Sequence, residues 1–229
     1  MSPEPACKPV RIWDLPTRLF HWLLALTVIG SLVSGQIGGN AMVWHIRLGL
    51  VVLALLAFRL VWGFAGGYWS RFAAFLYGPR SVAAYLRGER GPDGRFYIGH
   101  SPVGALSVWA LLGFLALQVA TGLIADDEIA TTGPLNRFVS NRIANLASTW
   151  HAQVGKRVLI VLAIAHVAAV LYYLWRKQRN LIAPMIHGDM PLPRGAVASA
   201  DGTVQRLAAL LIAAAAAALA WWIGSLATA

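Results

Sequence analysis

The chain has 229 residues, of which 58% are hydrophobic and only 12% are charged, and its mean hydropathy is +0.62. Soluble domains carry about 25% charged residues, so this composition excludes an ordinary soluble fold. The formal net charge of +10 does not indicate nucleic-acid binding, because the lysines and arginines lie mainly between the apolar runs. The one cysteine, Cys7, excludes an internal disulfide and a covalently attached haem.

The apolar residues gather into continuous runs long enough to cross a bilayer, which takes about 20 helical residues. Continuous runs predict helices, whose backbone groups are satisfied within the segment. We predict five transmembrane helices, at residues 17–37, 42–64, 103–124, 150–175 and 207–226. No convincing cleavage site follows the first run, so it is expected to stay as a helix.

We therefore expect an all-α integral membrane protein with four domains or segments. Residues 1–16 form a cytoplasmic N-terminal segment, and residues 17–188 form a transmembrane four-helix bundle. Residues 189–206 are a linker, and residues 207–229 contain a fifth, C-terminal transmembrane helix that is rich in alanine. That helix holds no ionisable side chain, so an anchoring or packing role is expected.

The charges between the spans predict the orientation. One side carries Lys8, Arg11, Arg18, Arg71, Arg80, Arg87, Arg90, Arg95, Arg176, Lys177, Arg179, Arg194 and Arg206. The other side carries Asp126, Asp127, Glu128, Arg137 and Arg142. The positive-inside rule places the N-terminus in the cytoplasm and both the acidic loop and the C-terminus outside. Residues 71–87, broken near Gly78, are either an interfacial helix on the inner leaflet or a structured loop.

Four histidines lie within the apolar runs or at their ends, where ionisable groups are costly and tend to be functional. His45 and His151 lie near the outer ends of the second and fourth spans, and His21 lies near the inner end of the first. His166 follows His151 by fifteen residues, which is about 22 Å along a helix and brings it level with His21. Depth therefore pairs His45 with His151 and His21 with His166.

Each pair can supply both axial ligands to the iron of one haem b, so two haems stacked across the membrane are expected. Six-coordinate haem suits electron transfer rather than oxygen activation. A lone histidine at a helix end is more often an interfacial anchor, and a zinc or proton-relay site predicts a local cluster instead of two separated pairs. The matched depths favour haem, with His21, His45, His151 and His166 as the iron ligands.

Basic side chains lie near the two predicted haem levels, and the haem propionates are their expected partners. They are Arg18, Arg47, Arg59 and Lys156. Snorkelling toward lipid headgroups explains the same residues about as well. Gly49 and Gly155 each follow an outer histidine by four residues, a spacing that lets a flat ring approach the helix.

Two further histidines stand outside this scheme. His100 precedes the third span at the inner surface; it could replace His21 as ligand or lie near the inner haem and a quinone. We prefer His21, because it lies within a helix whereas His100 precedes Ser101 and Pro102. His187 has no partner at matching depth and is interpreted as a loop residue.

Several local motifs together are similar to those of the bacterial cytochrome b561 family, which includes the b-type subunit of nickel–iron hydrogenases. The residues that carry the resemblance are 10–22 (VRIWDLPTRLFHW), 99–105 (GHSPVGA), 121–127 (TGLIADD), 133–135 (GPL), and 151–186 with His166, Asn180 and Pro184. Ser101 stands where the family more often has asparagine. The resemblance covers roughly residues 10–188 and leaves the fifth span outside.

This resemblance implies a four-helix core with two non-covalent haems b, held by the same four histidines. It also implies respiratory electron transfer in the bacterial inner membrane, between quinone and a c-type cytochrome or a periplasmic redox protein. The open alternatives are a haem-bearing anchor subunit of a hydrogenase or dehydrogenase complex, a stand-alone superoxide/quinone oxidoreductase, and a haem-free transporter. Whether the protein is itself an enzyme is left open by the sequence.

Overall fold

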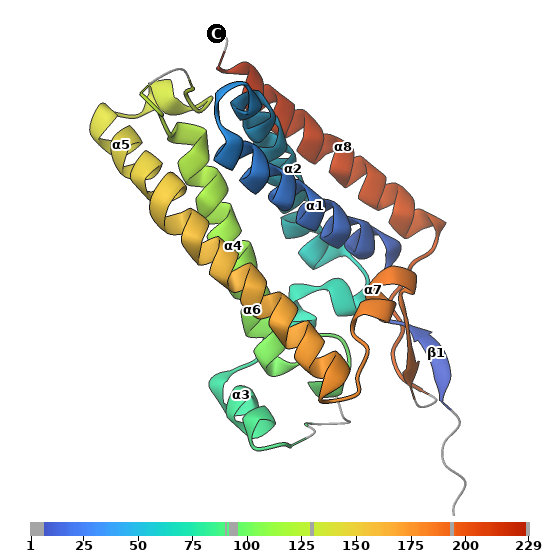
Figure 1. Ribbon diagram of the computed structural model, residues 1–229. Helices are drawn as coiled ribbons and strands as arrows, with labels where there is room; N and C mark the ends of the chain where they lie inside the picture. Colours follow the sequence, from blue (N-terminus) through green and yellow to red (C-terminus); the bar gives the residue numbers. More distant parts are fainter. Residues whose placement is uncertain (1–6, 90, 92–95, 129–130, 193–194, 228–229) are drawn as a thin grey trace, which may run out of the picture. The chain divides into compact units, whose positions relative to one another are not determined.

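Figure 1 shows the computed structural model of the chain, which describes residues 7–89, 91, 96–128, 131–192 and 195–227. Helices dominate, and one short two-stranded sheet accompanies them. In chain order the elements are β1 (Lys8–Arg11), α1 (Leu15–Ile37), η1 (Gly39–Ala41), α2 (Met42–Ala65), η2 (Tyr68–Ser70), η3 (Phe72–Phe75), α3 (Pro79–Leu86), α4 (Pro102–Ile124), η5 (Asn136–Phe138), α5 (Asn141–Thr149), η6 (Trp150–Gly155), α6 (Lys156–Trp175), α7 (Ile182–His187), β2 (Asp189–Leu192) and α8 (Thr203–Ser225).

Five helices of the described chain are long and apolar enough to cross a membrane, which confirms the predicted all-α, multi-pass fold. They are Leu15–Ile37, Gly39–Ala65, Pro102–Ile124, Asn141–Trp175 and Thr203–Ser225. Four of them begin and end within about one helical turn of the predicted spans. The predicted start of the fourth was wrong, because the helix begins at Asn141 and not at Trp150.

This fourth helix is one run of 35 residues made of α5, η6 and α6 (Figure 1). At 1.5 Å per residue it is about 52 Å long, well beyond the roughly 30 Å of a hydrocarbon core. The extra length is α5, where Asn141, Arg142 and Asn145 are exposed. These polar residues ended the apolar run in the sequence, but they do not end the helix, since helical hydrogen bonds need no apolar side chains.

The chain divides into two compact units. The second unit holds Phe20–Arg59, Trp109–Ala165 and Leu211–Ala229. Its core is built from Val52 of α2, Leu115 of α4 and Leu159 of α6, and Leu24 and Val28 of α1 pack against them. Four spanning helices therefore share this apolar core.

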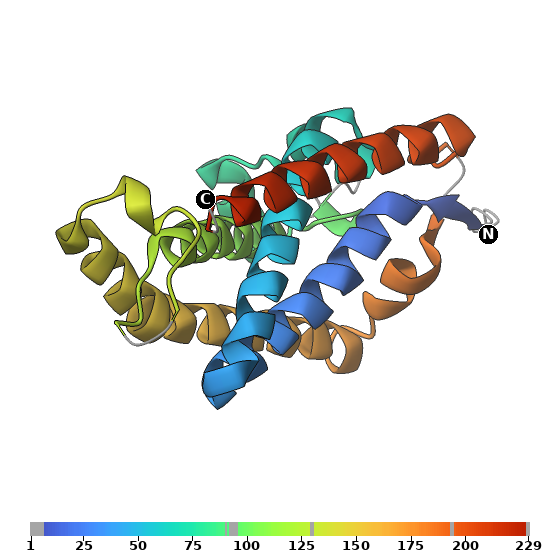
Figure 2. The ribbon, with the colours of Figure 1, turned by 90° about the horizontal axis from the view of Figure 1, so that it is seen from above.

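The turn between α1 and α2 depends on glycine. Gly38 and Gly39 have φ angles of 69° and 52°, in the left-handed region that side chains with a Cβ rarely adopt. The two blue helices therefore reverse direction at this turn in Figure 2.

In the second unit, α8 turns small residues inward. Ala216 and Ala220 are buried, and a Cβ built on Gly224 would lie 2.7 Å from Leu50 Cδ1 of α2. Its large side chains Trp221 and Trp222 are exposed. Small residues at helix contacts allow the close approach that is typical of membrane helices. The C-terminal helix is thus packed against α2.

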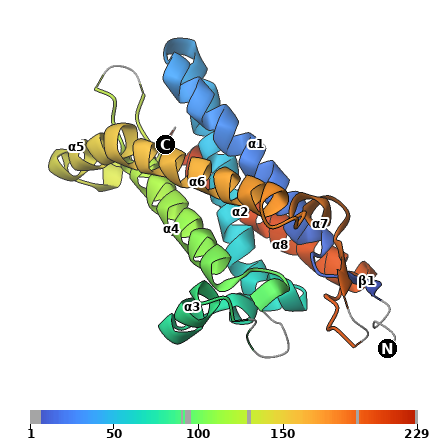
Figure 3. The same ribbon diagram turned by 60° about the horizontal axis from the view of Figure 1, so that its bottom comes forward.

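The first unit holds Met1–Leu19, Leu60–Val108 and His166–Leu210, and it includes the small sheet. β1 pairs antiparallel with β2, with Arg11 opposite Asp189, and β1 lies near α7 in Figure 3. The amides of Ile12 and Trp13 continue this pairing by donating to Gly188 O at 2.8 and 3.0 Å. Ile12, Trp13, Trp69 and Leu192 form the buried core of this region.

Residues 195–201, here called the strap, form hydrogen bonds with the start of the chain, although the sequence predicts a linker here. Ser199 N donates to Arg11 O at 2.7 Å, and Ser199 Oγ donates to Ile12 O at 2.7 Å. Trp69 Nε1 donates to Val197 O at 2.7 Å. The segment that leads into α8 is therefore anchored by hydrogen bonds at Ser199 and Val197, although several of its side chains, Val197 among them, are exposed.

Two carboxylates meet the N-terminus of α1, the end where a helix dipole favours negative charge. Asp14 is fully buried and accepts hydrogen bonds from Thr17 N, Trp62 Nε1, Gly67 N and Ser70 Oγ, at 2.8, 3.2, 3.0 and 2.6 Å. This residue caps α1 and joins it to the region after α2.

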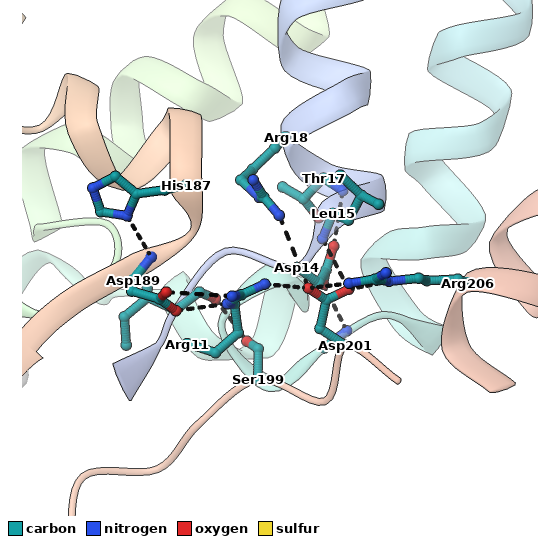
Figure 4. A network of polar contacts seen from close by, with 12 residues as sticks. Arg11, Asp14, Leu15, Thr17, Arg18, His187, Asp189, Ser199, Asp201 and Arg206 are labelled. Carbon is teal, nitrogen blue, oxygen red and sulfur yellow. Dashed lines mark hydrogen bonds and ion pairs between the residues drawn. The ribbon is translucent and has the colours of Figure 1, made fainter. Parts of the chain in front are cut away.

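Asp201 is the second carboxylate, and it comes from the far end of the strap (Figure 4). It accepts from Leu15 N at 3.1 Å, from Arg11 at 2.5 Å and from Arg206 at 3.2 Å, while Arg18 lies at 3.9 Å. Burial alone would raise the pKa of Asp201, but the hydrogen bonds from Arg206, Leu15 N and Arg11 lower it overall. The carboxylate therefore stays ionised and holds the strap to the first turn of α1.

Residues 71–87 contain both structure and a break at the predicted place. The turn η3 precedes the break, and α3 begins at Pro79 with Gly78 as its N-cap. Arg90, Arg95 and Arg194, which enter the charge count of the loops, lie outside the described residues.

Candidate functional site

The structure brings the side chains of His45 and His151 together in the second unit. Their Nε2 atoms lie 3.5 Å apart, and the ring centroids lie 5.7 Å apart with an angle of 82° between the ring planes. His45 stands near the start of α2, and His151 stands in η6, so two helices each contribute one ring. The pair that depth predicts for the outer level is thus a real neighbour pair.

Both rings are held from behind by a backbone carbonyl of the preceding spanning helix. His45 Nδ1 donates to Ser31 O of α1 at 2.8 Å, and His151 Nδ1 donates to Gln118 O of α4 at 2.8 Å. A carbonyl only accepts, so the proton of each neutral imidazole is on Nδ1 and Nε2 carries a free lone pair. Two metal-binding nitrogens therefore point at each other.

Glycine makes room for each ring one turn beyond the carbonyl that holds it. A Cβ built on Gly35 would lie 2.7 Å from His45 Nδ1, and one built on Gly122 would lie 2.7 Å from His151 Cε1. Gly35 follows Ser31 by four residues, and Gly122 follows Gln118 by four. The two histidines are thus seated in the same way, by a carbonyl at one position and a glycine one helical turn later.

The surroundings of His151 differ from those of His45 in one respect. His151 lies in η6, a π-helix over Trp150–Gly155, and such wide turns are frequent at functional sites. The side chain of Gln118, only 9% exposed, donates from Nε2 to His151 O at 2.8 Å. Because of the π-helix, His151 and His166 are not spaced by uniform α-helical turns, which the sequence argument assumed.

The distance between the two Nε2 atoms suits an iron ion bound by both histidines. Two metal–imidazole bonds of about 2.0 Å each would separate the Nε2 atoms by about 4 Å, close to the 3.5 Å observed. Space for a flat ring is indicated beside α2, since nothing lies within 4 Å of a Cβ built on Gly49. Gly155 instead contacts the side chain of Gln118. The residues at the outer level fit the group.

Among the described residues, no group of three or more His, Cys, Asp or Glu side chains lies close enough to hold a metal ion. Two axial histidines need no third protein ligand, because the porphyrin provides the other nitrogens. The outer pair therefore suits haem better than a zinc site, which takes three or four protein ligands.

His21 and His166 lie in different compact units. His21 is half-buried in α1, with its ring centroid 5.1 Å from that of Trp22. His166 is half-buried in α6. Their pairing stays a prediction.

The four basic residues expected near the haems have different surroundings. Arg59 is 4% exposed and lies over the ring of Phe20, the neighbour of His21. Arg47 is exposed and lies over the ring of Trp44, and Lys156 is half-buried. Arg18 donates to Ile186 O at 2.5 Å and faces Asp201 (Figure 4). Arg18 therefore contributes to the strap contact.

The two remaining histidines are placed in the first unit. The ring centroid of His100 lies 4.7 Å from that of Trp13 and 4.5 Å from that of Phe75. His187 is exposed and is the last residue of the short helix α7, so its interpretation as a loop residue was wrong. His187 Nδ1 accepts a hydrogen bond from Asp189 N at 3.2 Å.

Sequence reasoning missed the residues that seat the histidines. Ser31 and Gly35 on α1, and Gln118 and Gly122 on α4, all contact the rings or their backbone. Gln118 carried a signal, because an uncharged polar side chain in an apolar span usually has a partner inside the protein. Glycines in membrane helices are common, so Gly35 and Gly122 did not stand out.

Five apolar helices and a pair of facing imidazoles define the class of membrane-bound b-type cytochromes. The chain belongs to the prokaryotic cytochrome b561 family, whose family model matches residues 12–188. It is therefore a multi-pass membrane b-type cytochrome, and haem b is its cofactor. The strap and α8 lie beyond the matched region.

Curated relatives point to the same family. Three of them, from Bradyrhizobium diazoefficiens, Azotobacter vinelandii and Cupriavidus necator, are each named "Probable Ni/Fe-hydrogenase B-type cytochrome subunit". They are 22%, 24% and 23% identical to this chain over 213, 212 and 213 residues. The alignments cover 79%, 78% and 79% of this chain and 85%, 87% and 86% of the relatives.

Proposed function

We propose that the chain is a dihaem b-type cytochrome that carries electrons across the bacterial cytoplasmic membrane, between the quinone pool and a c-type cytochrome or other periplasmic redox protein. The observation that carries the proposal is the facing of His45 Nε2 and His151 Nε2 at 3.5 Å, each with its Nδ1 bound to a carbonyl. Bound haem supplies one-electron redox chemistry.

The chain's own residues fix how the outer ligands stand. Ser31 O and Gln118 O hold the imidazoles in the tautomer whose Nε2 binds metal, and such second partners raise ligand basicity. A haem held by both His45 and His151 would be suited to electron transfer rather than to oxygen binding. Val52, Leu115 and Leu159 form an apolar core within the same unit as this pair.

For the inner site we propose His21 and His166, the pair that matches in depth. Arg59, which is 4% exposed and lies over the ring of Phe20 next to His21, is the cationic side chain that we assign to the propionates of this haem. Arg47 and Lys156 are the corresponding candidates for binding the propionates of the outer haem. Lipid headgroups are the alternative partners of both side chains.

We also propose that the N-terminus is cytoplasmic. The described loops on that side carry Arg71, Arg80 and Arg87, and Arg176, Lys177 and Arg179, whereas the opposite loop carries Asp126, Asp127 and Glu128. Cys7, the one cysteine, is exposed and provides a native probe. A membrane-impermeant maleimide should label it in inverted vesicles and not in right-side-out vesicles; the reverse result would overturn the orientation.

The relatives favour a specific form of this function, the haem-bearing membrane subunit of a hydrogenase complex. Their names describe such a subunit, and a subunit works with a permanent partner. Mild-detergent purification from the native membrane discriminates the two forms. A stoichiometric hydrogenase or dehydrogenase partner supports the subunit, and a chain that purifies alone and exchanges electrons with soluble cytochrome c supports the carrier.

The test of the proposed function is a dithionite-reduced minus oxidised spectrum with haem quantified per purified chain. Two haems b per chain, titrating with one-electron potentials, are expected. A correctly folded wild-type protein with no haem would overturn the proposal. One haem per chain would retain the outer site and overturn the inner pair.

A further inference from the structure

Gln118 is a buried amide on a membrane helix, and it makes two contacts with one residue. Its backbone carbonyl accepts from His151 Nδ1 at 2.8 Å, and its side-chain Nε2 donates to His151 O at 2.8 Å. The first contact would survive any substitution at 118, because it uses the backbone. The side chain is therefore what ties the backbone of His151 to α4.

The π-helix explains why such a tie is useful. The π-helix, with its i→i+5 hydrogen bonds, is rare and occurs mostly as single turns inside α-helices, frequently at functional sites. The amide of Gln118 enters this turn, since a Cβ built on Gly155, the last residue of η6, would overlap Gln118 Oε1. A side chain at position 155 would therefore collide with the Gln118 amide, so the present position of the amide requires glycine at 155.

The amide is also placed where its second polar atom remains inside the protein. Gln118 Oε1 and Trp150 Nε1 are both buried and have no hydrogen-bond partner among the described residues, and both lie against Gly155. Burying a polar oxygen costs free energy of about 1–3 kcal/mol. An apolar residue at position 118 would avoid that cost. The presence of glutamine there is therefore better explained by the hydrogen bond that its Nε2 donates to His151 O.

His45 provides an internal comparison. Its ring has the same carbonyl and glycine arrangement, with Ser31 O and Gly35, but it lies in the regular helix α2. Ser31 Oγ adds only a contact of 3.2 Å to the same Nδ1. Among the described residues, a side-chain amide contacts the backbone of His151 and none contacts that of His45.

We infer that Gln118 is a positioning residue for the outer haem: by fixing the backbone of His151 in the π-turn, it sets the direction of that imidazole toward the iron. The inference rests on the proposed function, because it assumes that His45 and His151 hold a haem. Partners behind a metal-bound histidine typically change metal affinity by about 10–100-fold when removed. They also tune the reduction potential.

The experiment compares wild-type protein with Gln118→Met, which keeps the volume and removes the amide, and with the control Gly113→Ala, on the same helix α4, where an added Cβ has nothing within 4 Å. Haem transfer to a haem-free globin, the low-spin ferric EPR signals and the two midpoint potentials are measured on the purified full chain. In Gln118→Met, one of the two haems should leave about 10-fold faster or more, with a shifted EPR signal and potential. The other haem, and both haems of Gly113→Ala, should stay unchanged.

A second variant guards against simple misfolding. Gly155→Ala should displace the amide from the other side and alter the same haem, and the double variant should add little to either single change. Unchanged haem transfer, EPR and potentials in Gln118→Met would overturn the inference, and so would equal changes at both haems. A folded, haem-free wild-type protein would instead overturn the proposed function itself, and this inference with it.

Discussion

The cap of α1 and the outer histidine pair are both polar clusters in an apolar protein, but their donors and acceptors balance differently. At the cap, Asp14 and Asp201 meet backbone amides, hydroxyls and arginines of the same chain. At the pair, the two Nδ1 atoms are satisfied by carbonyls, while the two Nε2 acceptors face one another. A cluster that balances within the chain stabilises the fold, and one whose acceptors converge is suited to a cation such as iron.

The largest expected effect breaks the pair. His45→Ala or His151→Ala should each remove one haem completely and leave the other, because one imidazole cannot fill both axial positions. The measurement is haem per chain from the reduced spectrum, with His187→Ala, an exposed histidine outside both proposed sites, as control. Two haems retained in both variants would remove the pair from the site.

The cap should fail in a different way. Asp14→Ala leaves several buried donors without their acceptor, and hydrogen bonds to a charged group contribute about 1.5–3 kcal/mol each, so a loss of at least about 3 kcal/mol is expected. The thermal midpoint of the detergent-solubilised protein measures it. Asp189→Ala, which removes a partly exposed ion pair with Arg11, is the control and should cost about 1 kcal/mol or less. Equal losses would mean that burial of Asp14 does not matter.

Glycine substitutions sharpen the contrast at the pair itself. Gly122→Ala and Gly35→Ala each place a Cβ 2.7 Å from a histidine ring, so the ring must shift and about 1–3 kcal/mol of overpacking is expected. Both should shift the potential of the outer haem. Gly113→Ala on α4 has nothing within 4 Å and should be neutral or stabilising by up to about 1 kcal/mol. Identical behaviour at 113 and 122 would contradict the seating of the ring.

The smallest effect is a pH dependence of the cap. The pKa of Asp201 is lowered in the folded state, so its contribution to stability is present above the unfolded value of about 3.9 and is lost as pH falls through the folded value. Asp201→Asn should therefore destabilise by about 2 kcal/mol near neutral pH and flatten the acid limb of a stability-against-pH curve. A curve parallel to that of the wild type would assign the acid sensitivity to another group.

The sequence predicted the features that depend on composition and spacing. Five apolar runs predicted the helices, and the matching depths of His45 and His151 predicted that their side chains would lie close together. Contacts between distant segments could not be predicted, because Asp201 reaches Leu15 across nearly the whole chain and nothing local marks it. The π-turn at His151 was missed for the same reason, since it is held by Gln118 of another helix.

The strap has a consequence for the order in which the protein is made. Every residue that seats the outer histidines, from Ser31 to Gly155, leaves the ribosome before the strap does. The first turn of α1 is synthesised before these residues, but it gains its contact with Asp201 only after the strap has been made. The residues around His45 and His151 are therefore all synthesised while this contact is still missing, and domains generally fold in order from the N-terminus during synthesis. A haem at the proposed site would thus be able to bind before Asp201 reaches Leu15.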